Sequence, residues 1–71
     1  MMTVDQIVKY FTYQPPEPDQ IVEMTKIRDA AKELALCILD NSPSSADQTA
    51  AIRKLRECVM TANLAIMFRG Q

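Results

Sequence analysis

Two tyrosines and two basic side chains form the most chemically suggestive grouping in this sequence. Tyr10 and Tyr13 stand beside a proline-rich stretch, and Lys26 and Arg28 follow on the next predicted helix. An aromatic ring can stack on a nucleobase while a nearby cation holds phosphate, as in the recognition of unpaired bases. The grouping therefore predicts a site for a nucleotide-like anion. The alternative is that the tyrosines only staple the N-terminal arm to that helix.

Arg28 lies on or beside the apolar seam of its predicted helix, where a cation is unusual. A guanidinium in that position needs either a carboxylate partner or an anionic ligand. The residue four positions on is Lys32, of the same sign, and Lys26 and Asp29 are close by, so local pairing is incomplete. A pocket with two or more cations suits a phosphodiester.

The prolines separate a short N-terminal segment from the rest of the chain. Pro15, Pro16 and Pro18 fall within four positions. Proline fixes φ, removes a backbone donor and pushes the preceding residue out of the α region. The stretch 10–18 is therefore predicted to be a stiff, extended elbow.

Three helices are predicted around this elbow. A capping box at Thr3 and Gln6 starts a short helix that ends near Thr12. A second helix runs from Pro18 to about Asn41. After a turn at residues 42–45, a capping box at 45–48 starts a third helix from 46 to 69. Gly70 is expected to close it in the left-handed conformation.

Apolar residues recur every three or four positions along both long helices, as expected for helix packing. The short turn between them predicts an antiparallel pair. We expect an all-α fold: one helical-hairpin domain over 1–71, with an N-terminal arm (1–18) and a long antiparallel hairpin (19–69), assembled into a homo-oligomer. The predicted seams are Ile21, Met24, Ile27 or Arg28, Ala31, Leu34 or Ala35 and Ile38, facing Ile52, Leu55, Val59, Ala62 and Ile66.

The size of the chain predicts assembly. With 71 residues, a monomer buries only about 60% of its unfolded surface and needs disulfides, a metal or an oligomer for support. Cys37 and Cys58 are predicted to be small core residues, too far apart along the hairpin for an intrachain disulfide. The chain has no histidine and no predicted metal site, cofactor or membrane segment. Of the three kinds of support, this leaves assembly into an oligomer, and we expect the protein to work in a reducing cytoplasm.

The charges argue against general nucleic-acid binding, because the formal net charge is −1. One local basic patch, Arg53-Lys54-x-Arg56, is interpreted either as a solvated helix face or as support for a small helical adaptor or DNA-binding regulator. Arg69 could simply complement the dipole of the last helix. We expect no enzyme, since no histidine can activate a nucleophile and no catalytic motif is found.

Several stretches together resemble a known family. Tyr13-Gln14-Pro15-Pro16 and residues 27–32, 45–57 and 59–63 resemble the short helical-hairpin proteins of tailed phages known as anti-CBASS protein 2. The resemblance covers about 13–68 and implies a sponge in the host cytoplasm. Such a sponge binds cyclic oligonucleotides of bacterial CBASS immunity and sequesters them without cleavage.

The resemblance also implies an assembly and site residues. It suggests a compact homohexamer with cyclic dinucleotides at protomer interfaces and cyclic trinucleotides in separate pockets. By position, Tyr13 resembles the base-stacking aromatic and Arg28 the basic residue that contacts the dinucleotide. Arg69 resembles the C-terminal arginine of the trinucleotide pocket, with Gln14 and Ala30 lining it.

Overall fold

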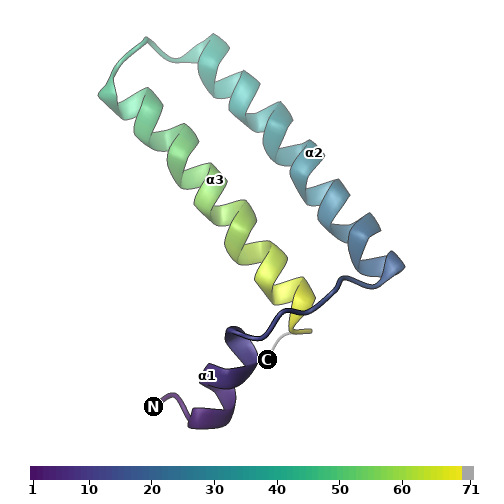
Figure 1. The fold of residues 1–71 in the computed structure, drawn as a ribbon. Coiled ribbons are helices and arrows are strands. Elements are labelled where there is room, and N and C mark those ends of the chain that lie inside the picture. The colour runs from purple at the N-terminus through teal and green to yellow at the C-terminus, as the bar shows by residue number, and fades with distance from the viewer. Residues whose placement is uncertain (70–71) are drawn as a thin grey trace.

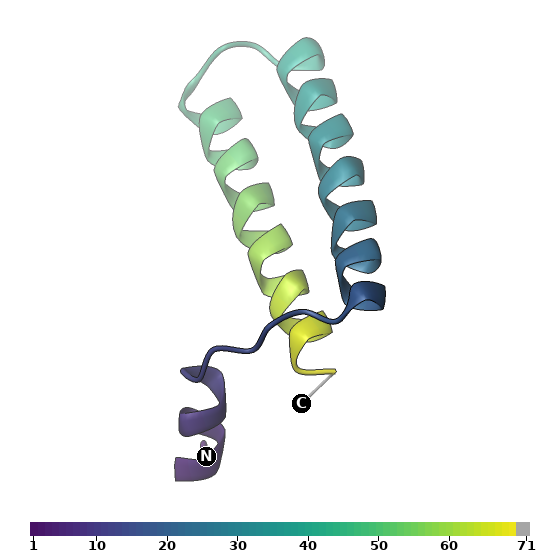
Figure 2. The same cartoon turned by 45° about the vertical axis from the view of Figure 1, so that its right-hand side comes forward.

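The computed structural model describes residues 1–69, which form three α-helices and no strand. α1 spans Val4–Tyr10, α2 spans Pro18–Asn41 and α3 spans Ala46–Met67. α2 and α3 lie side by side and antiparallel, and α1 projects from the open end of this hairpin (Figure 1 and Figure 2). The predicted all-α class and helical hairpin are confirmed.

The starts of α1 and α2 follow the predicted signals. The Thr3 side chain accepts from the Gln6 amide while the Gln6 side chain accepts from the Thr3 amide, which completes the capping box. Pro18 occupies the first turn of α2, where its missing N–H costs nothing. α1 ends at Tyr10, two residues before the predicted Thr12.

The C-terminal end of α3 differs from the prediction. The helix ends at Met67 with Phe68 as its C-cap, rather than continuing to Arg69. Arg69 itself has a φ of 50°, the left-handed conformation that was expected at Gly70. Gly70 lies outside the described residues. The helix ends where the Phe68 ring, only 8% exposed, is buried at the open end of the hairpin.

The seam between α2 and α3 agrees with the predicted spacing except at one position. Arg28 and Leu34 are exposed, which leaves their alternatives Ile27 and Ala35 on the seam. Ile21 is also exposed, because the residue that faces α3 in that turn is Gln20. The half-buried seam residues are Met24, Ile27, Ala31, Ala35 and Ile38 on α2, and Ile52, Leu55, Val59, Ala62 and Ile66 on α3.

A glutamine side chain connects the two helices at the open end of the hairpin. Gln20 is 4% exposed. Its Nε2 donates to the Ile66 carbonyl at 3.0 Å, and its Oε1 accepts from the Glu17 amide at 2.8 Å. This side chain therefore caps the start of α2 and joins it to the last turns of α3.

A second glutamine connects the helices at the turn. Gln48 Nε2 donates to the Leu39 and Ser42 carbonyls at 3.3 and 2.9 Å, and to Ser42 Oγ at 3.1 Å. Ser45 Oγ accepts from the Gln48 amide, which is half of the predicted capping box. In the other half of a capping box, the Gln48 side chain would accept from the Ser45 amide. Here that side chain instead donates to the Leu39 and Ser42 carbonyls at the end of α2.

Little of the chain is buried. Its accessible surface is 5874 Å², about a third more than the ~4,450 Å² typical of a folded monomer of this mass. Its radius of gyration is 15.3 Å, against about 11 Å for a compact domain of this length. Cys37 and Cys58, predicted as core residues, are free and exposed, because each lies one position off the seam.

Candidate functional site

Arg28 lines a groove on one face of the hairpin, with a volume of about 380 Å³. Two further cations line it, Lys32 from α2 and Arg56 from α3, and all three side chains are exposed. Positive charge around an apolar floor suits an anion that has an apolar or flat part. The floor is formed by Ala31, Ala35, Ile52, Leu55, Val59 and Met60.

Tyr13 lies in the elbow between α1 and α2 and is 83% exposed. It lines none of three cavities found among the described residues, those beside Tyr10, Arg28 and Gln14. Arg28 is ten residues beyond the start of α2, which is about 15 Å along the helix axis. Tyr13 therefore does not belong to the groove that Arg28 lines, and the contact of both residues with one ligand stays a prediction.

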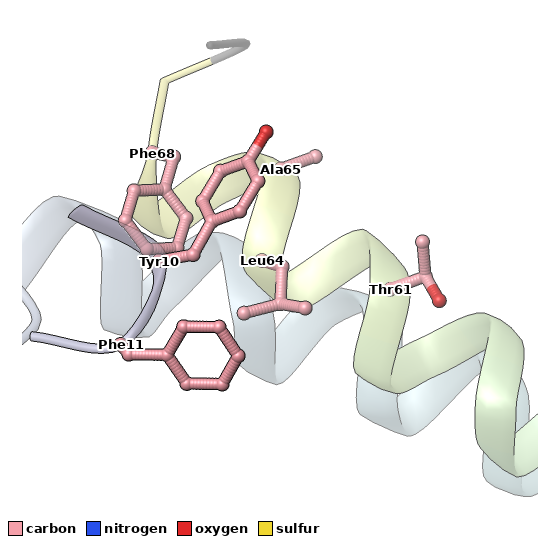
Figure 3. A pocket seen from close by; sticks show the side chains of 6 residues that line it. All are labelled: Tyr10, Phe11, Thr61, Leu64, Ala65 and Phe68. Carbon is pink, nitrogen blue, oxygen red and sulfur yellow. The ribbon is translucent and has the colours of Figure 1, made fainter. Parts of the chain in front are cut away.

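Tyr10 packs on the end of α3. Its ring meets the Phe68 ring edge to face, with centroids 5.3 Å apart and planes at 70°. The two rings lie together in Figure 3, with the Phe11 ring below them in this view and Thr61 nearer the start of α3. The tyrosine contact that was predicted with α2 is thus made with α3 instead. The same residues, with Leu64 and Ala65, line a cavity of about 480 Å³.

Gln14 lies in the same region of the chain. It lines a smaller cavity of about 160 Å³ together with Tyr10, Thr12, Leu64, Met67 and Phe68. Arg69 follows directly after Phe68 and is exposed. The structure thus brings Tyr10 and Gln14 to one cavity, at the end of the helix that precedes Arg69.

Lys26 is exposed on α2, two residues before Arg28. Successive residues of a helix are rotated by about 100°, so a spacing of two places them on different faces. Lys26 does not line the groove that Arg28 lines. Its assignment to the ligand site remains a prediction.

Sequence reasoning missed the role of Arg56 in the groove, because it grouped Arg56 with Arg53 and Lys54. The signal was present: Arg56 is four residues after Ile52 and three before Val59, so it borders the seam. Gln20 was missed for a related reason. It is a polar residue four positions before the seam residue Met24, and such a position needs a hydrogen-bond partner.

Residues 1–69 contain neither a cluster of metal-binding side chains nor a helix that could span a membrane. No group of three or more His, Cys, Asp or Glu side chains there is placed to hold a metal ion. No helix in that range has both the length and the hydropathy needed to cross a bilayer.

Comparison with known proteins supplies one match. No curated protein and no solved structure matched the chain. The family described as "Acb2/Tad1, hairpin domain" matches residues 3–67, which include all three helices and the elbow. This match confirms the resemblance to anti-CBASS protein 2. The chain belongs to the Acb2/Tad1 hairpin domain family.

Proposed function

We propose that this protein is a phage anti-defence sponge, which binds cyclic dinucleotides of CBASS immunity in the host cytoplasm and sequesters them unchanged. The observation that carries this proposal is the position of Arg28 at an open groove of a hairpin that belongs to the Acb2/Tad1 family. A guanidinium binds phosphate oxygens through paired hydrogen bonds. A cyclic dinucleotide supplies two phosphates and two bases to such a site.

The site takes ligand between copies of the chain. Tyr13 does not line the Arg28 groove of its own protomer, whereas a neighbouring protomer can bring its exposed Tyr13 ring over that groove. The ring then stacks on a base, and Arg28 neutralises phosphate. The large exposed surface of the single chain supports assembly, and the family resemblance suggests a homohexamer.

A second pocket takes cyclic trinucleotides. Its residues are Gln14, which lines the small cavity beside Tyr10, and Arg69 at the end of α3. Amide and guanidinium groups together can contact base edges and phosphate. Tyr10 supports this pocket through its contact with Phe68.

The ligand leaves the site chemically unchanged. Sequestration needs binding groups alone, and the candidate residues are an aromatic ring, an amide and cations, none of which is paired with a general base in our assignment. Recovery of ligand tests this point. The protein is saturated with cyclic di-GMP, digested with protease, and the released nucleotide is examined by mass spectrometry. Intact cyclic nucleotide is expected, whereas a linear product would make the protein an enzyme.

Calorimetry with cyclic di-GMP and cyclic di-AMP tests the dinucleotide site. Tyr13→Ala and Arg28→Ala are each expected to weaken binding by about tenfold to hundredfold, since stacking and charged hydrogen bonds are each worth about 1–3 kcal/mol. Tyr13→Phe retains the ring and is the matched control, with affinity close to the wild type. Unchanged binding by both alanine variants contradicts this assignment. Binding of duplex DNA without any response to cyclic nucleotides favours the regulator alternative.

A further inference from the structure

The groove that contains Arg28 draws its charge from both long helices. Arg28 and Lys32 stand four residues apart on α2, and such residues are neighbours on one helix face. Arg56 reaches the same groove from α3. None of the described residues that line the groove is acidic. Three cations therefore share one groove. The sequence pattern had assigned them to two separate basic patches, one on each long helix.

Like charges at a spacing of four destabilise a helix, so the pair on α2 is unfavourable in the free protein. The two remaining basic residues of the Arg53-Lys54-x-Arg56 patch do not line the groove, although they are exposed on the same helix. Of the three basic residues in that patch, Arg56 is thus the one that lines the groove with Arg28 and Lys32. An anion with more than one charge placed between Arg28, Lys32 and Arg56 replaces this repulsion with attraction.

The floor of the groove restricts what kind of anion fits. It is built from alanine, isoleucine, leucine, valine and methionine side chains, which make apolar contacts and few hydrogen bonds. A free inorganic ion would leave that surface exposed to water. A nucleotide places its phosphates at the rim and its ribose or base on the floor, so that both parts of the groove are used.

We infer that Arg56 and Lys32 are ligand-binding residues that act with Arg28, so that the phosphates of a cyclic dinucleotide are held by α3 as well as by α2. This inference rests on the proposed function and extends it to two residues. Arg56 supplies the groove with a charge from α3, in addition to the two charges from α2.

The test compares single variants of the full-length protein by calorimetry with cyclic di-GMP and cyclic di-AMP. Arg56→Ala and Lys32→Ala are each expected to weaken binding by about tenfold or more, the usual effect of losing a charged hydrogen bond. Arg53→Ala and Lys54→Ala are the matched controls, since each removes the same charge from α3 outside the groove. Both controls are expected to bind within about twofold of the wild type.

The outcomes separate this inference from the proposed function. If the wild type binds neither nucleotide, the proposed dinucleotide site and the inference are both wrong. If the wild type binds and Arg56→Ala matches Arg53→Ala, only the inference is overturned. Light scattering of each variant checks assembly, and Arg56→Gln provides a second variant that retains a long polar side chain. Dissociation of the oligomer by both Arg56 variants assigns the groove to contact between copies and also overturns the inference.

Discussion

Gln20 donates its side-chain amide to the main-chain carbonyl of Ile66, at 3.0 Å, across the open end of the hairpin. Both residues are partly or fully shielded from water, and Gln20 is the most buried polar side chain among residues 1–69. A hydrogen bond in such a place matters mainly through the cost of leaving its groups unpaired. The contact therefore fixes the register between the start of α2 and the end of α3.

Replacing Gln20 by alanine tests the importance of that contact. Gln20→Ala leaves the Ile66 carbonyl and the Glu17 amide without their partner, so the free energy of unfolding is expected to fall by about 1–3 kcal/mol. Urea denaturation at fixed protein concentration measures the change. Gln6→Ala is the control, because Gln6 caps only the short α1, and it is expected to cost less than about 1 kcal/mol. Equal effects of the two variants contradict the assignment.

The turn end of the hairpin gives a parallel prediction. Gln48→Ala removes the donor to Leu39 and Ser42, with an expected loss of about 1–2 kcal/mol. Because Gln20 and Gln48 lie at opposite ends of the hairpin, the double variant is expected to show the sum of the two losses. A clear excess over that sum in the same denaturation experiment argues that the two ends are coupled.

Asn63 offers a substitution that is expected to stabilise the hairpin. Its Oδ1 is buried and has no hydrogen-bond partner within the described residues. Asn63→Leu keeps the size of the side chain and removes the unsatisfied atom, so a gain of about 1 kcal/mol is expected. Asn41→Leu, at an exposed asparagine that bonds the Cys37 carbonyl, serves as the comparison and is expected to bring no gain. Destabilisation by Asn63→Leu shows that the oxygen has a partner in the assembled protein.

The contact between Tyr10 and Phe68 predicts how α1 is held. An edge-to-face aromatic pair is worth about 0.5–1.5 kcal/mol beyond its buried area. Tyr10→Ala is therefore expected to release α1 and to expose its amides to hydrogen exchange, while α2 and α3 stay protected. Phe11→Ala removes a neighbouring ring that is 85% exposed and should change the exchange of α1 less. Equal rates of hydrogen exchange at the α1 amides in the two variants would contradict the role of the Tyr10–Phe68 contact in holding α1.

Assembly is expected to appear as a dependence of stability on concentration. The chain exposes 5874 Å², and we expect part of this surface to be buried against other copies. The Tm is then expected to rise with protein concentration. Light scattering is expected to give the mass of a hexamer. A stable folded monomer at dilute concentration would contradict the proposed site, because that site is formed between two copies of the chain.

Local signals in the sequence were sufficient for most of the fold. α2 begins at Pro18 and ends at Asn41 as predicted, because proline suits the first turn and the residues at 42–45 lack apolar side chains to continue the helix. The seam followed from spacing alone. The end of α3 could not be predicted in this way, because it depends on where Phe68 meets Tyr10, a residue from the other end of the chain.

The site was less predictable than the fold. Arg28 was predicted as a site residue because a cation beside a seam is unusual. Arg56, which lines the same groove, was not singled out because it stands among neighbouring cations of its helix. Which of these cations reaches the groove depends on the rotation of α3 against α2, which spacing alone leaves undefined. The Gln20 contact could not be predicted for a similar reason. Its partner Ile66 lies 46 residues away in the sequence, so their contact depends on how α2 and α3 pack. The proposed role of Tyr13 involves a second copy of the chain, so the structure of one chain does not test it.

Each long helix carries one free, exposed thiol, Cys37 on α2 and Cys58 on α3. Thiol reagents attack accessible cysteines first. The rate of alkylation at each cysteine therefore measures how accessible the surrounding helix surface is to the reagent. Comparing dilute with concentrated protein then reveals which of the two helices becomes covered as copies associate. The unmodified protein thus carries two chemical reporters of its own packing, and no substitution is needed to use them.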